Sequence, residues 1–120
     1  LTADSTATLG VKWATPATAD LTINAKTANY SLVAGDVNKL ITMSSASTTT
    51  LTVPNGVFTT GQQINVQRLG AGAVQIRNDG TTVLTSTGAT STAPDLRAQF
   101  SAATIICTSS NNFTVIGDLA

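Results

Sequence analysis

Threonine occupies 23 of the 120 positions in this chain, whereas glutamate is absent and lysine occurs only three times. Surface helices draw on the straight-chain residues that are scarce here. Threonine is β-branched and is favoured on the half-buried surface of a sheet. The sequence therefore predicts an all-β fold.

Many short β-branched runs follow one another at roughly ten-residue spacing, and each ends at Gly, Asn, Asp or Pro. This pattern is typical of a sandwich or a barrel. Leu, Ile, Val and Phe together supply 29 residues, enough for the core of one small domain. We expect a small antiparallel β-sandwich or barrel of about eight to ten short strands.

The first twenty residues differ from the rest, because small residues dominate them and they show no sustained hydrophobic period. Thr15–Pro16 favours an extended backbone. We interpret residues 1–20 as an extended arm or linker and residues 21–120 as the β-rich domain. Because residue 1 is Leu and not Met, we expect the chain to be a piece of a longer protein.

The strand predictions follow from alternating apolar residues between turn residues. From Ile64 to Leu84 they describe a three-stranded meander, with a hairpin turn at Gly70–Ala71–Gly72 and another turn at Asn78–Asp79–Gly80. A final hairpin loop is predicted at Ser109–Asn112. The predicted strands lie at 21–24, 30–32, 40–43, 49–53, 64–68, 74–76, 83–84, 96–100, 103–107 and 113–116.

Composition excludes several classes of function. The net charge is zero, so there is no basic patch for nucleic acid. There is no histidine, which removes histidine-dependent enzymes and most transition-metal sites. The apolar runs are only a few residues long, too short for a membrane span. We expect no enzyme activity, no catalytic residue, no metal site and no cofactor.

Individual polar residues fit structural roles. Cys107 lies in an apolar run, so we expect an inert core thiol. Asp36, Asp79, Asp95 and Asp118 sit beside Gly, Pro or Asn, where aspartate hydrogen-bonds its own backbone in turns. We expect Arg68, Arg77 and Arg97 at solvated or interface-rim positions, and Tyr30, Phe58, Phe100 and Phe113 in core packing.

Several passages resemble structural proteins of tailed-bacteriophage particles. The opening "LTADSTATLGVKWATP" resembles a linker of such proteins, and "YSLVAGDVNKLITM", "TLTVPNG", "GQQINVQRLGAGAVQI" and "NNFTVIGDL" resemble their β-rich terminal domains. The resemblance implies a virion protein on the particle surface, either a tail fibre or minor tail protein or a capsid decoration or head fibre protein. It implies a homo-oligomer, with a trimer suggested by the likeness to fibres, docked to capsid or tail shell proteins.

The arm carries the candidate interface. Leu9, Val11 and Trp13 stand at alternate positions and share one side if the segment is extended. We expect them to dock on the β domain of the same or an adjacent subunit, with Trp13 as the anchor. The alternative is a carbohydrate-binding receptor module at a fibre tip, in which Trp13 stacks on a host surface glycan. An exposed cluster of aromatic residues with Asn and Asp would favour that alternative.

Overall fold

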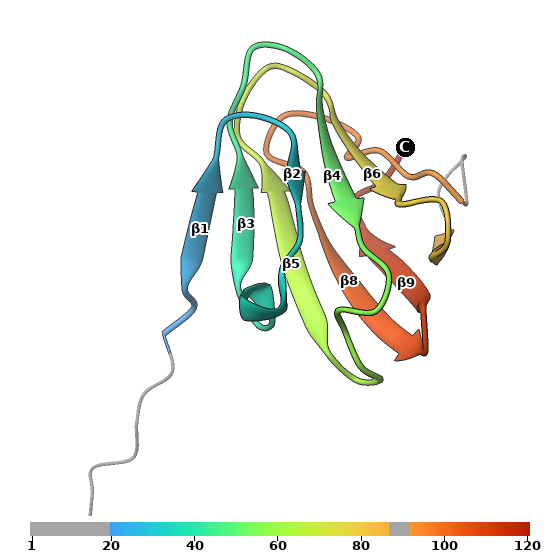
Figure 1. Ribbon diagram of the computed structural model, residues 1–120. Coiled ribbons are helices and arrows are strands. Elements are labelled where there is room, and N and C mark those ends of the chain that lie inside the picture. The colour runs from blue at the N-terminus through green and yellow to red at the C-terminus, as the bar shows by residue number, and fades with distance from the viewer. Residues whose placement is uncertain (1–19, 87–91) are drawn as a thin grey trace, which may run out of the picture.

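The computed structural model describes residues 20–86 and 92–120 (Figure 1). Within these ranges strands dominate, and the one helical element is a single 3-10 turn, η1 (Ala34–Asp36). The all-β prediction is confirmed, and the number of strands agrees with it. The nine strands are β1 (Ile23–Lys26), β2 (Tyr30–Ser31), β3 (Leu40–Met43), β4 (Thr49–Val53), β5 (Gln63–Arg68), β6 (Val74–Asn78), β7 (Val83–Ser86), β8 (Ala102–Ser109) and β9 (Asn112–Gly117).

The strands form two sheets that lie against each other (Figure 1). One has six strands in the order β1-β3-β5-β8-β9-β7, and the other has three in the order β2-β4-β6. Successive strands from β1 to β6 therefore alternate between the sheets, and each strand pairs in parallel with the next strand of its own sheet. The chain winds in coils, as a short β-solenoid.

The prediction of an antiparallel sandwich or barrel is wrong. Five of the seven strand pairings are parallel, and only β5 with β8 and β8 with β9 run antiparallel. A parallel pair needs a long crossover connection, and in the four parallel pairs from β1 to β6 each crossover contains a strand of the opposite sheet. Alternating apolar residues reveal which face of a strand is buried but not which strand lies beside it, so the residue pattern did not distinguish the two arrangements.

The predicted meander is also wrong, because β5 and β6 belong to different sheets. The segment Gly70–Ala71–Gly72 crosses between the sheets and stacks on the preceding crossover loop. The Gly72 N–H donates to the Ser45 carbonyl at 2.8 Å. A Cβ atom added to Gly72 would overlap the backbone of Ser47, and one added to Gly70 would overlap Ser45. These glycines serve the close approach of two stacked loops, not a hairpin.

In the last part of the chain, one predicted hairpin is confirmed and one predicted strand is not found. β8 and β9 form the predicted final hairpin, with Asn111 at a φ of 58° in its loop. The predicted strand at 96–100 is absent. Residues 94–96 instead lie along the outer edge of β6, where the Ile76 N–H donates to Pro94 O at 2.9 Å and the Leu96 N–H to Val74 O at 3.0 Å.

The core lies between the two sheets and takes inward residues from both. Phe58 and Phe113 meet in it edge to face, with ring centroids 6.1 Å apart, so their predicted core packing is confirmed. No helix in the described part of the chain is long and apolar enough to cross a membrane. The buried apolar residues are Leu32, Ile41, Met43, Leu51, Val53, Phe58, Ile64, Val66, Val74, Ile76, Leu84, Leu96, Ala103, Ile105, Cys107, Phe113 and Val115.

Candidate functional site

The six-stranded sheet turns one face to the core and the other outward. Along its strands, core residues alternate with residues of the outward side. We call the outward set the outer face. Thr42 belongs to it by register, although its neighbours cover it almost fully. The outer face consists of Ile23, Ala25, Leu40, Thr42, Gln63, Asn65, Gln67, Val83, Thr85, Ala102, Thr104, Ile106, Asn112, Thr114 and Ile116.

No residue of the outer face is charged, and aliphatic side chains stand at both ends of one row across it. By register this row runs from Ile23 and Leu40 through Asn65 and Thr104 to Ile116. Ile23 is 61% exposed and Ile116 is 47% exposed. In the middle of the row the Thr104 hydroxyl donates to Asn65 Oδ1 at 2.7 Å, so these two polar groups satisfy each other. A neutral surface of this kind loses little ion hydration when another protein covers it.

A groove of about 360 Å³ opens in the outer face over β5, β8 and β9. Its walls are formed by small residues and by one aliphatic side chain, Ile116. Gly117 has a φ of 148°, and a Cβ there would meet Ala103 at 2.6 Å, so β9 approaches β8 closely only because this residue is glycine. The lining consists of Asn65, Ala102, Ala103, Thr104, Ile116 and Gly117. Such a lining can hold an apolar group, while the Thr104 hydroxyl already donates its proton to Asn65 Oδ1.

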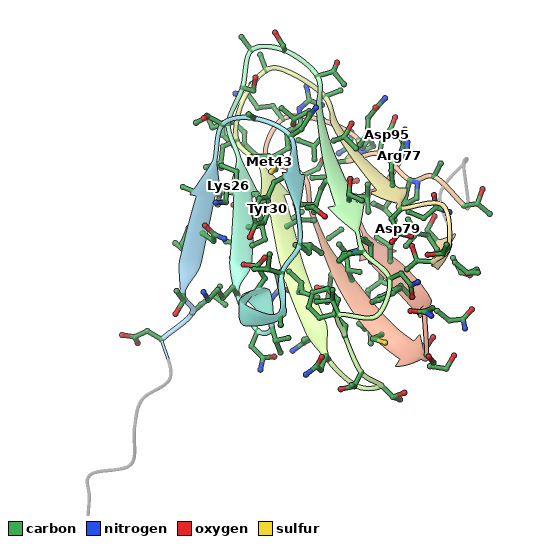
Figure 2. The ribbon with its side chains drawn as sticks, viewed as in Figure 1. Lys26, Tyr30, Met43, Arg77, Asp79 and Asp95 are labelled. Atoms are coloured by element: carbon green, nitrogen blue, oxygen red, sulfur yellow. The ribbon has the colours of Figure 1, made fainter. Side chains whose placement is uncertain are left out.

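A buried aspartate joins the first coils of the winding. Asp36 is 1% exposed, and its carboxylate accepts hydrogen bonds from Tyr30 Oη at 2.6 Å, from Asn24 Nδ2 at 3.0 Å and from the Val33 N–H at 2.9 Å. Burial and the neighbouring carboxylate raise the pKa of Tyr30 to about 12. Lys26 Nζ lies 4.3 Å from the centroid of the Tyr30 ring (Figure 2). Asp36 was predicted to serve a turn; it does so through Val33, and it also links β1, β2 and η1.

Asp79 has the turn role that the sequence predicted. Its Oδ1 accepts hydrogen bonds from the backbone of Thr81 at 3.0 Å and of Thr82 at 3.1 Å, and its Oδ2 accepts one from the Asn55 N–H at 2.6 Å. These bonds hold the pKa of Asp79 well below its usual range, and the bonds from Thr81 have the largest effect. The turn therefore ties the end of β6 to the loop after β4 (Figure 2).

Two of the arginines form ion pairs within the chain. Arg77 lies 2.7 Å from Asp95 (Figure 2). Arg97 binds Asp118 through two parallel hydrogen bonds of 2.7 and 2.8 Å, and Ser101 Oγ donates to the same carboxylate at 2.7 Å. Asp95 and Asp118 thus act as ion-pair partners, which the turn interpretation missed. The pairing with Arg97 lowers the pKa of Asp118 to about 2 and raises that of Arg97.

The Asp118 pKa gives a testable pH dependence. Because the folded pKa lies below the ordinary value of 3.8, the pairing stabilises the fold above about pH 4 and is lost as the pH falls towards about 2. Replacing Asp118 with asparagine removes this contribution. We expect the difference in Tm between the two proteins, measured by circular dichroism, to be constant above about pH 4 and to shrink below it. A difference that stays the same down to about pH 2 would contradict this pairing.

Two further side chains have roles inside the fold. Cys107 is fully buried, as predicted, and its Sγ lies 3.2 Å from Ser109 O; burial raises the pKa of the thiol. Arg68 reaches the carbonyls of Gly70 and Ala71, which fixes the crossover loop. Among the residues of 20–86 and 92–120, no group of three or more metal-ligating side chains could hold a metal ion.

The predicted interface residues Leu9, Val11 and Trp13 lie outside the described residues, so their docking stays a prediction. The sequence missed the outer face and misplaced Phe100, which is 63% exposed and not part of the core. The alternating residues from Leu96 to Phe100 predicted a strand, and no Gly or Pro in that segment indicates the turn that the structure contains.

Comparisons of the chain with protein-family models, with curated proteins and with solved structures gave no match.

Proposed function

We propose that this chain is a non-enzymatic structural module of a bacteriophage particle, displayed on the particle surface. It acts by docking, through its outer face, to copies of itself and to capsid or tail shell proteins. The sequence resemblance to tail fibre, minor tail, capsid decoration and head fibre proteins supports the proposal that the chain belongs to a phage particle. The resemblance fits a position on the head as well as one on the tail. The arm residues Leu9, Val11 and Trp13 are a second proposed contact with the same or an adjacent subunit.

The observation that carries the docking proposal is the absence of charge on the outer face. The described residues include ten charged side chains, and none of them is among the outer-face residues; Arg97 and Asp118, which border this surface beside Ala102, neutralise each other. Exposed aliphatic residues such as Ile23, Val83 and Ile116 stand on it. Burying them against a partner is favourable, and no ion has to be desolvated.

A carbohydrate-binding tip has less support. Sugar sites assemble aromatic rings, and in the described part of the chain the rings are dispersed. Phe58 and Phe113 are buried, and the Tyr30 hydroxyl is bound to Asp36. That leaves Phe100 as the single aromatic side chain that is mostly exposed in residues 20–86 and 92–120.

The direct test is the composition and structure of phage particles from a culture that produces this chain. We expect mass spectrometry to detect the chain in purified particles, and a cryo-EM map to show its outer face covered by another copy or by a shell protein. Purified particles without the chain, or a map with the outer face in solvent, would overturn the proposal.

A matched pair of variants tests the surface itself. Ile116 and Val33 are exposed to nearly the same extent, 47% and 51%, but only Ile116 belongs to the outer face. Ile116→Lys places a charge in the interface, and we expect it to weaken docking by roughly 10-fold or more. The same change at position 33 should leave docking unchanged. Copies per particle, measured by quantitative mass spectrometry, distinguish the two results.

A further inference from the structure

Phe100 combines exposure with a strained backbone. It is the third residue of the turn Ala98–Ser101, which is closed by the Ser101 N–H donating to Ala98 O at 3.1 Å. Phe100 has a φ of 71°, and positive φ at the third residue alone is the geometry of a type II turn. That position favours Gly or Asn, because a larger side chain is strained there. The strain does not serve the core, since the ring is 63% exposed.

The turn holds Phe100 in place although its ring is exposed. The Phe100 N–H donates to Arg68 O at 2.7 Å, and Gln67 Nε2 donates to Phe100 O at 3.3 Å. Next to it, Gln99 Nε2 donates to Leu69 O at 3.0 Å. The turn is therefore attached to β5 and to the loop that follows it. An exposed ring on a fixed backbone loses little conformational entropy when it is buried by a partner.

The groove of the outer face begins two residues after Phe100, at Ala102. Small side chains line most of it, and it is shallow and open to solvent, so a side chain of a partner can reach it from outside. We propose that Phe100 of one copy inserts into this groove of a second copy, forming a two-fold pair. In such a pair each copy supplies both the ring and the groove, because the two features lie together on one chain. This inference rests on the proposed function and names the partner and the anchor of the outer face.

The size of the outer face agrees with a pair of moderate affinity. Six strands about 4.8 Å apart and about five residues of 3.3 Å each cover roughly 480 Å² per copy. Two copies would then bury on the order of 1,000 Å², the lower end of specific interfaces. The outer-face residues carry no charge, and the exposed Arg97–Asp118 pair beside Ala102 is neutral overall, so no net charge opposes the second copy. We expect the pair to form in the micromolar range.

Sedimentation velocity of the whole chain across micromolar concentrations tests the pair. Phe100→Asn keeps the turn, since Asn tolerates positive φ, and removes the ring. We expect it to raise the dissociation constant roughly 10-fold or more. The Tm, measured at a dilution where both proteins are monomeric, should rise by about 2–5 °C as the strain is relieved. A role in the fold alone would instead lower the Tm and leave association unchanged.

Two further variants complete the experiment. Ala102→Met fills the groove without adding charge and should weaken the pair to a similar extent, whereas Val33→Ala removes an exposed aliphatic group elsewhere and should have no effect. A wild-type chain that is strictly monomeric, or an oligomer of any number that Phe100→Asn leaves intact, would overturn the pairing. Neither result shows whether the chain is present in phage particles. That part of the proposed function is tested separately, by mass spectrometry of purified particles.

Discussion

Replacing Asp36 with alanine is expected to lower the free energy of unfolding by about 3–5 kcal/mol, a large part of the stability of a domain of this size. The carboxylate is 1% exposed and accepts hydrogen bonds from Tyr30, Asn24 and Val33. Alanine leaves the three donors without their acceptor. A lost bond to a charged group costs about 1.5–3 kcal/mol, but the total stays below the sum of three because none of the donor residues is fully buried, so water can reach them. Urea unfolding followed by circular dichroism measures the loss.

Two matched variants separate the contributions to this network. Asp36→Asn keeps the shape and one acceptor oxygen, so we expect a smaller loss than with alanine. Tyr30→Phe removes only one of the three bonds, which should cost about 1.5–3 kcal/mol and less than the loss with alanine. If Asp36→Ala unfolded at the same urea concentration as Tyr30→Phe, the carboxylate would not be the centre of the network.

Replacing Gly72 with alanine is expected to destabilise the fold by about 2–4 kcal/mol. The new Cβ would overlap the backbone of Ser47, and a backbone can move away only if the stacked loop separates from its neighbour. The Gly72 N–H bond to Ser45 O would be weakened at the same time. Urea unfolding again gives the change in free energy.

Gly35 provides the matched control, because a Cβ at that position meets nothing within 4 Å and its φ is not positive. Gly35→Ala should change the free energy of unfolding by no more than about 0.5 kcal/mol. Equal effects of the two substitutions would show that the crossover loops do not stack closely. In the hairpin predicted from the sequence, Gly72 would have no second loop above it.

Local features of the sequence predicted much of the fold. The alternation at Thr49–Val53 and at Val74–Ile76 located β4 and β6, because each strand buries one face. The order in which the strands pair within the sheets could not be predicted in the same way. Whether β5 pairs with β6 or with β3 depends on which crossover loops stack, and the glycines at 70 and 72 suit a hairpin turn as well as a stacked loop.

The candidate site depends on neighbours that are far apart in the chain. Asn65 and Ile116 stand in one row of the outer face only because β8 lies between β5 and β9, and neither residue belongs to a sequence motif. Composition indicated neutral, threonine-rich strands but not that every outward position of one sheet is uncharged. Phe100 was misplaced because Leu96 and Phe100 fit one alternating pattern, while their backbones have different conformations.

The edges of the three-stranded sheet limit how far copies can polymerise through it. The outer edge of β6 is covered by residues 94–96, whose backbone takes up its hydrogen bonds, while β2 pairs only with β4 within the described residues. Strand addition needs an uncovered edge on both partners. Two copies joined at their β2 edges would leave only covered edges outside. Growth would terminate there, so edge pairing through this sheet yields a closed pair and not a filament.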